Sequence, residues 1–591
     1  MIKKFILISV IFVLSIFVFP KGFAEAATYY ACNNANTCGS GWATGNDANS
    51  CNSKSTACGT IRAGILKMLG GDELVIGDGT YTGTSNSIYN IPSGSAGKYT
   101  IIRAENDWGT IVTAKSPSYP TPSAYINNNQ YIEIRGIKFL GTNGLKLYVI
   151  NSDHIKIIRC SSDGVVEGNG SSFAVAGSSY VLFEECFSYG AGRYPFGVTK
   201  NYSTDAPSHH IIFRRNVCRW DYSNTIEPQA CFANYDQEYV YYQNNVVVDG
   251  KEIRGIDAPY DGAKGFFTPN GAKETHFQGN IVLNFEGTGY RIEQSPVSNV
   301  TLTDSIAWNT KWTTNDVTYP ANLFYSDDGI GPLTVNRATL GDNDLTNYGG
   351  SDISNITLRA ASSTIKNSII YGNAPKGIYG YAVRVHNNGI SQYNSYYNNT
   401  PGKDNYNGIG ATSFNNINPL NNGLKYLPRI EDNSFLKTAG ENGLQVGAQI
   451  VKRYGASGTL WGEAGWDVLT NDDLWPFPNE DVIKKDVASF YKSPNEVYAG
   501  SPEMIGARGF AADGNGLYGN PITLTSYIWE YLGNPCPADI CNYTQTFSPA
   551  DTNQNGKIEM KELVAFIGRW KTNQAVLSDV LDAMGRWLRG E

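Results

Sequence analysis

Ten short segments between residues 131 and 398 share one pattern of apolar and polar positions. Each has two or three alternating apolar residues, one or two polar residues, a small or amide residue, and a second apolar run. The segments are YIEIRGIKF, IKIIRCSSD, VLFEECFSY, IIFRRNVCR, VYYQNNVVV, THFQGNIVL, TLTDSIAWN, TVNRATLGD, STIKNSIIY and ISQYNSYYN. An alternation of period two predicts β-strands, and a repeat of this length predicts that they stack as a solenoid.

The small or amide position defines a column that recurs every 24 to 35 residues. Its members are Gly136, Cys160, Cys186, Asn216, Asn245, Asn280, Ser305, Ala338, Asn367 and Asn394. We interpret each repeat as one coil of a parallel β-helix, with this column as a ladder at a sharp bend. Asparagine tolerates left-handed backbone at a bend, and its side chain can hydrogen-bond to its neighbours in the stack.

Two other repeat architectures fit less well. A β-propeller has four strands in each repeat and its own signatures, which this sequence lacks. A hexapeptide solenoid keeps a strict six-residue rhythm, whereas these coils vary in length. Over roughly residues 70 to 400 the coil pattern resembles the right-handed parallel β-helix superfamily, which includes pectate, alginate and chondroitin lyases and polygalacturonases. The resemblance implies the fold, and a fold alone does not define a function.

Composition and the first residues bear on the location of the protein. Only 17% of the 591 residues are charged, the net charge is −8, and no basic run occurs, which argues against nucleic-acid binding. Residues 1–26 form an expected secretory signal: Lys3 and Lys4, an apolar core at 5–19, and Ala24-Glu25-Ala26 as the cleavage site. No later stretch is apolar enough to span a membrane. We therefore expect a secreted protein that is extracellular or held at the cell surface.

Ten cysteines are expected to form disulfides in an oxidising compartment. Cys32, Cys38, Cys51 and Cys58 could form two bridges, with three possible pairings. Their spacing does not match the paired CxxC pattern of a zinc site. Cys536 and Cys541 could close a small loop, and Cys218 and Cys231 are a looser pair. Cys160 and Cys186 share the ladder column, so they either form a bridge or stack.

The sequence divides into six parts. After the signal, residues 27–71 are expected to cap the first coil, with a helix at 60–69 over its apolar end. Coils follow over 72–400. Residues 401–535, with helical spacing in two aromatic segments, are expected to form a C-terminal cap or subdomain against the last coils. A linker at 536–549 then leads to a last domain at 550–591.

The motif with the clearest chemistry is DTNQNGKIEMKE at residues 551–562. It fits the calcium-loop pattern D-x-[DN]-x-[DN]-G-x5-E at every position. The predicted oxygen ligands of Ca²⁺ are Asp551, Asn553, Asn555, the carbonyl of Lys557, Glu559 through water, and bidentate Glu562. The alternative is an Asp/Asn-rich turn that holds no metal.

Two helices are expected after this loop, and Gly568-Arg569-Trp570 recurs as Gly585-Arg586-Trp587. A calcium loop with only its exiting helix, duplicated at the C-terminus of a secreted β-helix protein, resembles a dockerin. The resemblance implies docking to a cohesin-like or surface partner. Dockerins usually carry two calcium loops, and the second repeat here has none, so one ion is expected. The alternative is a helical hairpin that only ends the chain.

Candidate catalytic residues follow the strand that precedes each ladder segment. Lys200 follows PFGVT, Asp236 follows CFANY, and Asp327 and Asp328 follow LFYS. Glu293, Arg384 and His386 occupy similar places. The β-helix lyases use a basic residue to abstract a proton beside a uronate carboxyl, and the hydrolases use paired carboxylates. Asp327-Asp328-Gly329 lacks the NTD and GHG motifs that accompany the aspartate pair of polygalacturonases, which excludes a close match.

Two further columns have structural explanations. Arg159, Glu185 and Arg215 share a column on three adjacent coils, with Glu184 and Arg214 beside them, and form an expected charge ladder. His154, Tyr180, His210 and Tyr239 share another column, where ring stacking along the solenoid is expected.

The sequence thus predicts a secreted, carbohydrate-directed parallel β-helix protein with a calcium-binding tail. If it is an enzyme, a polysaccharide lyase is the first expectation and a glycoside hydrolase the second. The alternative is a non-catalytic surface, adhesive or structural protein. These functions differ in whether Lys200, Asp236 and Asp327 converge in one groove.

Overall fold

A computed structural model describes the chain in 20 ranges separated by short gaps. The described residues are 26–113, 122–141, 145–163, 171–190, 193–220, 230–250, 263–294, 296–311, 321–328, 331–360, 362–386, 388–415, 417–419, 424–492, 503–504, 506–541, 550–552, 558–572, 574–575 and 577–589. The expected signal at 1–26 lies almost wholly outside them. Within these ranges, none of the helices is both long enough and apolar enough to cross a membrane.

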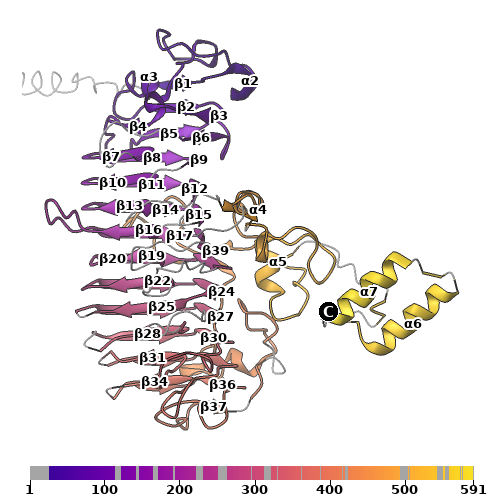
Figure 1. Cartoon of the computed structure of the whole chain (residues 1–591). Coiled ribbons are helices and arrows are strands. Elements are labelled where there is room, and N and C mark those ends of the chain that lie inside the picture. Colours follow the sequence, from indigo (N-terminus) through magenta and orange to yellow (C-terminus); the bar gives the residue numbers. More distant parts are fainter. Residues whose placement is uncertain are drawn as a thin grey trace, which may run out of the picture.

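Three long sheets of parallel strands form the body of the molecule (Figure 1). Sheet A contains β1 (Thr28–Ala31), β2 (Glu73–Ile76), β5 (Thr100–Ala104), β8 (Gln130–Arg135), β11 (Asp153–Ile158), β14 (Ser179–Glu184), β17 (His209–Arg214), β20 (Glu238–Gln243), β23 (Lys273–Gln278), β26 (Ser298–Thr303), β29 (Leu333–Asn336), β32 (Thr364–Lys366) and β35 (Ile390–Gln392). Sheet B contains β3 (Gly79–Tyr81), β6 (Thr110–Val112), β9 (Ile137–Phe139), β12 (Ser161–Asp163), β15 (Phe187–Gly190), β18 (Val217–Trp220), β21 (Val246–Val248), β24 (Ile281–Glu286), β27 (Ile306–Lys311), β30 (Thr339–Gly341), β33 (Ile369–Tyr371), β36 (Ser395–Tyr397) and β37 (Phe414–Asn415).

Sheet C contains β4 (Ile88–Tyr89), β7 (Ala124–Asn127), β10 (Leu147–Ile150), β13 (Ser171–Ala176), β16 (Tyr194–Thr199), β19 (Ala230–Asn234), β22 (Lys264–Pro269), β25 (Thr288–Glu293), β28 (Phe324–Ser326), β31 (Ile356–Leu358) and β34 (Val383–Val385). The chain visits sheets C, A and B in turn, so each visit to all three makes one coil. This topology confirms the predicted parallel β-helix. Each repeated segment is a strand of sheet A, a bend, and a strand of sheet B.

The bend differs in one respect from the prediction. The left-handed residue comes one position before the ladder, for example Arg159 (φ 52°), Glu185 (φ 55°) and Arg215 (φ 53°). Gly136 and Asn367 also take this left-handed position, so their assignment to the ladder is wrong; Ile137 and Ser368 stand in the ladder instead. In Asn367-Ser368 both residues fit the small-or-amide position, so the sequence left the position of the ladder ambiguous by one residue.

The asparagine ladder is buried and hydrogen-bonded from coil to coil. Asn245 Oδ1 accepts from Asn216 N at 2.9 Å and from Asn216 Nδ2 at 3.0 Å. Asn245 Nδ2 donates to Phe213 O and to Asn280 Oδ1. In the same column, Cys160 and Cys186 are buried free thiols, so they stack and do not form a bridge.

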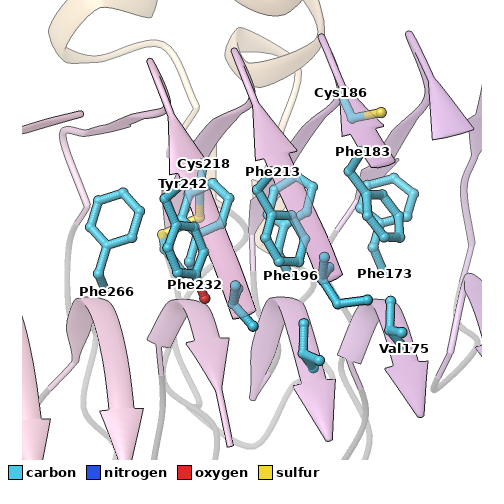
Figure 2. Packing of buried hydrophobic residues seen from close by; sticks show 14 of the residues in the cluster. Phe173, Val175, Phe183, Cys186, Phe196, Phe213, Cys218, Phe232, Tyr242 and Phe266 are labelled. Carbon is cyan, nitrogen blue, oxygen red and sulfur yellow. A yellow bond between two sulfur atoms is a disulfide. The ribbon is translucent and has the colours of Figure 1, made fainter. Parts of the chain in front are cut away.

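Aromatic rings stack inside the solenoid in the same register (Figure 2). One stack follows sheet A through Phe183, Phe213, Tyr242 and Phe277, with centroids 5.0–5.3 Å apart. The other follows sheet C through Phe173, Phe196, Phe232, Phe266 and Tyr290, with centroids 4.7–5.2 Å apart. These distances match the spacing of parallel strands, so the rings are held at the separation that stacking favours.

The N-terminal segment that was expected to cap the first coil contributes β1 to sheet A. Disulfides join Cys32 to Cys38 and Cys51 to Cys58. The helix α3 (Ile61–Ile65) is shorter than the predicted 60–69, and Ile61, Ile65 and Met68 belong to the core that continues into the coils. A short α2 (Ala35–Cys38) lies between the cysteines.

The described residues between 424 and 541, which we call the C-terminal strap, return along the side of the coils. They contain α4 (Glu480–Ala488), α5 (Leu524–Trp529) and the antiparallel pair β38 (Lys452–Tyr454) and β39 (Leu469–Asp473). Trp475, Phe477 and Trp529 pack with Phe187, Val217, Leu283 and other side chains on the outside of sheet B. Lys138 pairs with Asp486 at 2.6 Å, so the strap reaches well beyond the last coils against which it was expected to fold.

Arginines that were predicted to form a charge ladder also hold the strap. Arg159 and Arg215 both pair with Glu185, at 2.9 and 3.4 Å, which confirms that ladder. Arg214, however, does not pair with Glu184: it donates to Gln243 and to the carbonyls of Ala456, Thr459 and Trp466. Arg214 and Arg215 are fully buried, and burial lowers the pKa of Arg214 to about 10 and that of Arg215 to about 9. Both are structural residues.

The ring column is also confirmed. Tyr131, His154, Tyr180, His210 and Tyr239 stack with centroids 4.6–4.9 Å apart. Trp461 of the strap contacts His210, and burial lowers the pKa of this imidazole to about 4. His210 therefore packs as a neutral ring.

The last domain is a pair of helices, α6 (Met560–Lys571) and α7 (Leu577–Arg589). Leu563, Phe566, Val580 and Ala583 form its core with Ala550 and Ile558. Several other apolar side chains are exposed: Met560, Val564, Trp570, Leu577, Leu581 and Met584 are 39–59% exposed. Ile567 and Trp587 are partly buried against the core.

We predict that Asn245→Ala destabilises the solenoid. It removes the acceptor of Asn216 N and the donor to Phe213 O, and leaving each buried group without a partner costs about 1–3 kcal/mol. The urea midpoint of unfolding should fall clearly. Asn106→Ala, which removes one exposed bond to Asp78, should leave the midpoint almost unchanged. Equal midpoints for the two variants would contradict the structural role of the ladder.

Candidate functional site

The outer face of sheet C carries one continuous column of side chains. The strand register aligns Tyr89, Tyr125, Tyr148, Ala174, Gly197, Ala233, Phe267, Arg291, Tyr325, Thr357 and Arg384. Side chains alternate across a strand, and the neighbours of these residues point into the core. Aromatic residues or arginines occupy most of this column. Ala174, Gly197 and Ala233 are three consecutive small members, so they leave a hollow on this face.

A pocket of about 620 Å³ lies over this hollow. Ala174 and Gly197 line it, and Tyr125 and Tyr148, which stack at 6.0 Å, form one end. Tyr194, Tyr202, Tyr235, Arg193 and Lys200 also line it. No described residue of the strap is among the lining residues, because the strap covers sheets A and B. We call this site the sheet C pocket.

Tyr194 is held in place by packing. It is buried in a small cluster with Ala230, Ala233 and Phe267, beside Tyr235. The guanidinium of Arg193 lies over the Tyr194 ring at 5.0 Å from its centroid. Gly197 is required here because a Cβ at this position would lie 3.0 Å from Ser171 Oγ and 3.1 Å from Tyr194 Cβ. The small residue therefore both opens the pocket and admits the tyrosine.

Lys200 enters the pocket from the loop that joins β16 to β17. An antiparallel bridge between Asn201 and Ala206 closes this loop, and Tyr202 at its tip is 64% exposed. Lys200 Nζ lies 2.6 Å from Asp205 and 5.7 Å from the centroid of the Tyr202 ring. The hydrogen bond from Lys200 to Asp205 raises the pKa of this ammonium. Lys200 is therefore a cation at neutral pH, which suits it to bind an anion and not to accept a proton.

Asp236 lies one coil beyond Lys200. Tyr235 N bonds to Val198 O, which places the ends of β16 and β19 side by side. Burial raises the pKa of Asp236, and the neighbouring positive charge of Lys200 acts in the opposite direction. Lys200 and Asp236 thus interact through their charges without an ion pair, and Asp236 is not among the residues that line the sheet C pocket.

Asp327 and Asp328 do not join this pair. They follow β28, three coils beyond β19, and three steps of about 4.8 Å separate them from Asp236 by roughly 14 Å. Asp327 accepts from Gln294 N at 3.3 Å, and Asp328 lies 3.8 Å from Arg359. Glu293, on the same edge, pairs with Arg291 at 2.5 Å. All four predicted catalytic residues lie along one edge in two groups, with Lys200 and Asp236 on adjacent coils and Asp327 and Asp328 three coils beyond.

Sequence reasoning missed Arg193, Tyr194 and the paired Tyr125 and Tyr148. The available signal was the column one or two residues before the end of most sheet C strands, where Gly197 in PFGVT follows Tyr148 and Ala174. Loops of variable length separate these segments, so the column becomes visible only when the strands are in register.

The calcium-loop prediction can be compared with part of the structure. Asn553, Asn555 and Lys557 lie outside the described residues. Asp551 and Glu562, at the two ends of the loop, are both buried. Glu562 Oε1 accepts from Thr552 N and Oγ1 at 3.0 and 2.8 Å, and Oε2 accepts from Glu559 N at 3.0 Å.

These bonds hold the Glu562 carboxylate beside Thr552, the residue after Asp551, where the predicted loop begins. Asp551 and Glu562 would hold a Ca²⁺ ion from the two ends of the loop, and the calcium site stays a prediction. In the part of the chain that the structure describes, no group of three or more His, Cys, Asp or Glu side chains is placed to hold a metal.

Comparisons with known proteins show weak similarities only. No family model matches this chain, and no curated protein matches it. Among solved structures, the pectate lyase Pel9A is 14% identical with a TM-score of 0.39, covering 71% of this chain and 96% of its own. A rhamnogalacturonan lyase is 12% identical with a TM-score of 0.38, covering 69% and 94%. The Streptococcus pneumoniae surface protein and adhesin PfbA is 12% identical with a TM-score of 0.37, covering 58% and 91%. Similarities this low carry no inference about function.

We predict that the full chain binds calcium through Glu562. Glu562→Gln removes one negative charge and one oxygen ligand, so calorimetric titration should show calcium affinity reduced by at least about 10-fold. Lys561→Gln changes an exposed neighbour that pairs with Glu559 and should keep the affinity. Binding that is unchanged in Glu562→Gln, or absent from the unsubstituted chain, would contradict the calcium site.

Proposed function

We propose that the protein binds an acidic polysaccharide in the sheet C pocket. One observation supports this most directly: two cationic side chains, Arg193 and Lys200, project into a pocket whose walls are formed by five tyrosines. Ligand pockets combine apolar or aromatic walls with a few placed polar groups. Tyrosine rings offer an apolar face to the C–H groups of a sugar and a hydroxyl at the edge. The cations add recognition of a carboxylate.

Each lining residue has a role in this proposal. Arg193 donates its hydrogen bonds in a planar fork that matches a carboxylate, and Lys200 contributes a point charge. Asp205 holds Lys200 in position and keeps it protonated. Tyr148 and Tyr194 contact the sugar ring, and the open outer face of sheet C lets the chain continue beyond the pocket.

We predict that Arg193→Met and Lys200→Met each weaken binding of polygalacturonate by about 10-fold, the value of one charge-assisted contact. Affinity electrophoresis would measure the effect, with neutral dextran as the comparison polymer. Lys452→Met is the matched control, because this half-exposed lysine pairs with Asp473 on the strap. The proposal fails if the control weakens binding as much, or if dextran binds as well as polygalacturonate.

A polysaccharide lyase is the second candidate, and the opposite charges of Lys200 and Asp236 on adjacent coils favour it. In this reaction a base removes the proton from the carbon beside the uronate carboxylate. The electron pair forms a carbon–carbon double bond, and the bond to the adjoining sugar oxygen breaks. Lys200 would neutralise the carboxylate, and Asp236 would accept the proton. A carboxyl whose pKa is raised by burial accepts a proton more readily than an exposed one.

We predict that the mature protein raises ultraviolet absorbance when incubated with polygalacturonate, because elimination leaves an unsaturated product. Asp236→Asn should reduce the rate by roughly 10²–10⁴-fold, the usual contribution of a general base, while affinity changes little. A flat trace, with reducing sugar also unchanged, would exclude cleavage. It would favour the alternative of a non-catalytic surface or adhesive protein that uses the same pocket for binding.

The C-terminal domain completes the proposal as a calcium-stabilised docking module for a cohesin-like or surface partner. Val564 on α6 and Leu577 and Leu581 on α7 are 50–59% exposed, and exposed apolar groups of this kind mark interaction surfaces. Four disulfides, including Cys218–Cys231 and Cys536–Cys541, fit an oxidising compartment and support a secreted protein that acts outside the cell.

A further inference from the structure

The far end of the outer sheet C column carries a second set of aromatic and basic side chains. Asn405 bridges Val383, and Tyr406 N bonds to Val383 O, so Tyr406 continues the column after Arg384. The Arg384 guanidinium lies over the Tyr406 ring at 4.8 Å, and Lys403 Nζ lies over the Tyr381 ring at 5.0 Å. The two rings meet edge to face at 5.3 Å. We call these four residues the terminal basic cluster.

The cations of this cluster have no acidic partner among the residues that the structure describes. Arg384 makes one hydrogen bond, from Nη1 to Tyr379 O at 3.4 Å, and Lys403 donates to the carbonyls of Gly377 and Ile378. Most other arginines of the coils and strap lie within 4 Å of a carboxylate: Arg103, Arg135, Arg159, Arg215, Arg291, Arg337, Arg359, Arg429 and Arg453. The terminal basic cluster therefore retains positive charge that the fold elsewhere neutralises.

Nearby carboxylates are engaged by other donors. Asp352 accepts from Tyr379 N at 3.0 Å, and Asp404 accepts from Asn399 Nδ2 at 3.0 Å. Around the cluster, Tyr406 is 45% exposed, Tyr379 56% and Ile378 72%. Large apolar groups exposed beside unneutralised cations are typical of a binding surface and not of a packed solenoid end.

We propose that the terminal basic cluster is a second saccharide-binding site, selective for sugars that carry a carboxylate. Arg384 and Lys403 would bind the carboxylate, and the Tyr406 and Tyr379 rings would pack against the sugar. A ring beside a cation suits a saccharide better than an acidic peptide, because a sugar presents an apolar face and an anion on one unit.

This site is separate from the sheet C pocket. Six steps of the column lie between Gly197 and Arg384, which at about 4.8 Å each amounts to roughly 29 Å. The inference does not depend on cleavage in the pocket. Where one polymer reaches both sites, the second contact becomes intramolecular and strengthens binding beyond either site alone.

The experiment measures the second site in a full chain whose pocket is filled by Ala174→Trp. Titration calorimetry with a galacturonate trisaccharide reports the terminal basic cluster directly, and the same titration of Arg384→Gln, Lys403→Gln and Tyr406→Ala tests its members. Lys452→Gln is the charge-matched control. Unfolding midpoints confirm that each variant is folded. Because Tyr406 is 45% exposed, Tyr406→Ala tests the site even where Arg384→Gln does not fold.

We expect the pocket-filled chain to bind the trisaccharide, and each cluster variant to weaken this binding by about 10-fold while the control does not. Loss of all binding on filling the pocket would overturn the second site without affecting the first. Equal binding by the cluster variants would also overturn it. Tighter binding of poly-glutamate than of the trisaccharide would show that the cluster recognises acidic peptides, and a neutral maltotriose that binds equally would remove the role of charge.

Discussion

In-register stacking of parallel strands is the constraint on which the rest of this structure depends. Each residue has the equivalent residue of the next coil as its neighbour, at the spacing of two hydrogen-bonded strands. A column of one chemical type then becomes a continuous feature. Asn216, Asn245 and Asn280 form a hydrogen-bonded ladder, and Phe183, Phe213 and Tyr242 form a stack of rings. Because these columns are buried, a shift of register would leave amides unpaired and rings separated.

The same constraint explains where a ligand can bind. Sheets A and B are covered by the C-terminal strap, which Arg214 and Arg215 anchor through buried hydrogen bonds to its carbonyls. The pocket lies on the outer column of sheet C. The side chains of this column determine the shape and charge of the surface. Where this column contains Ala174 and Gly197 it forms a pocket, and where it contains Arg384 and Tyr406 it forms a charged aromatic surface. One face of the solenoid can therefore hold two sites without any change in backbone.

The fold could be predicted from the sequence because alternation and repeat length survive the variable loops. The charge ladder at Arg159, Glu185 and Arg215 and the histidine–tyrosine stack were also visible, since both lie in the most regular part of each coil. The site was harder to predict. Lys200 and Asp236 were found because they follow strands, but Asp327 and Asp328 follow strands equally well and lie three coils away. The distance between two residues along the solenoid depends on the number of coils between them. The position of the pocket depends on which residues of the column are small, such as Gly197.

The central claim is that the sheet C pocket holds an acidic sugar. The most direct measurement is a crystal structure of the protein soaked with a galacturonate oligosaccharide. The account predicts a sugar ring against Tyr148 and Tyr194, with its carboxylate within hydrogen-bond distance of Arg193 and Lys200. A well-ordered sugar elsewhere on the molecule, with the pocket holding only water at saturating ligand, would contradict it.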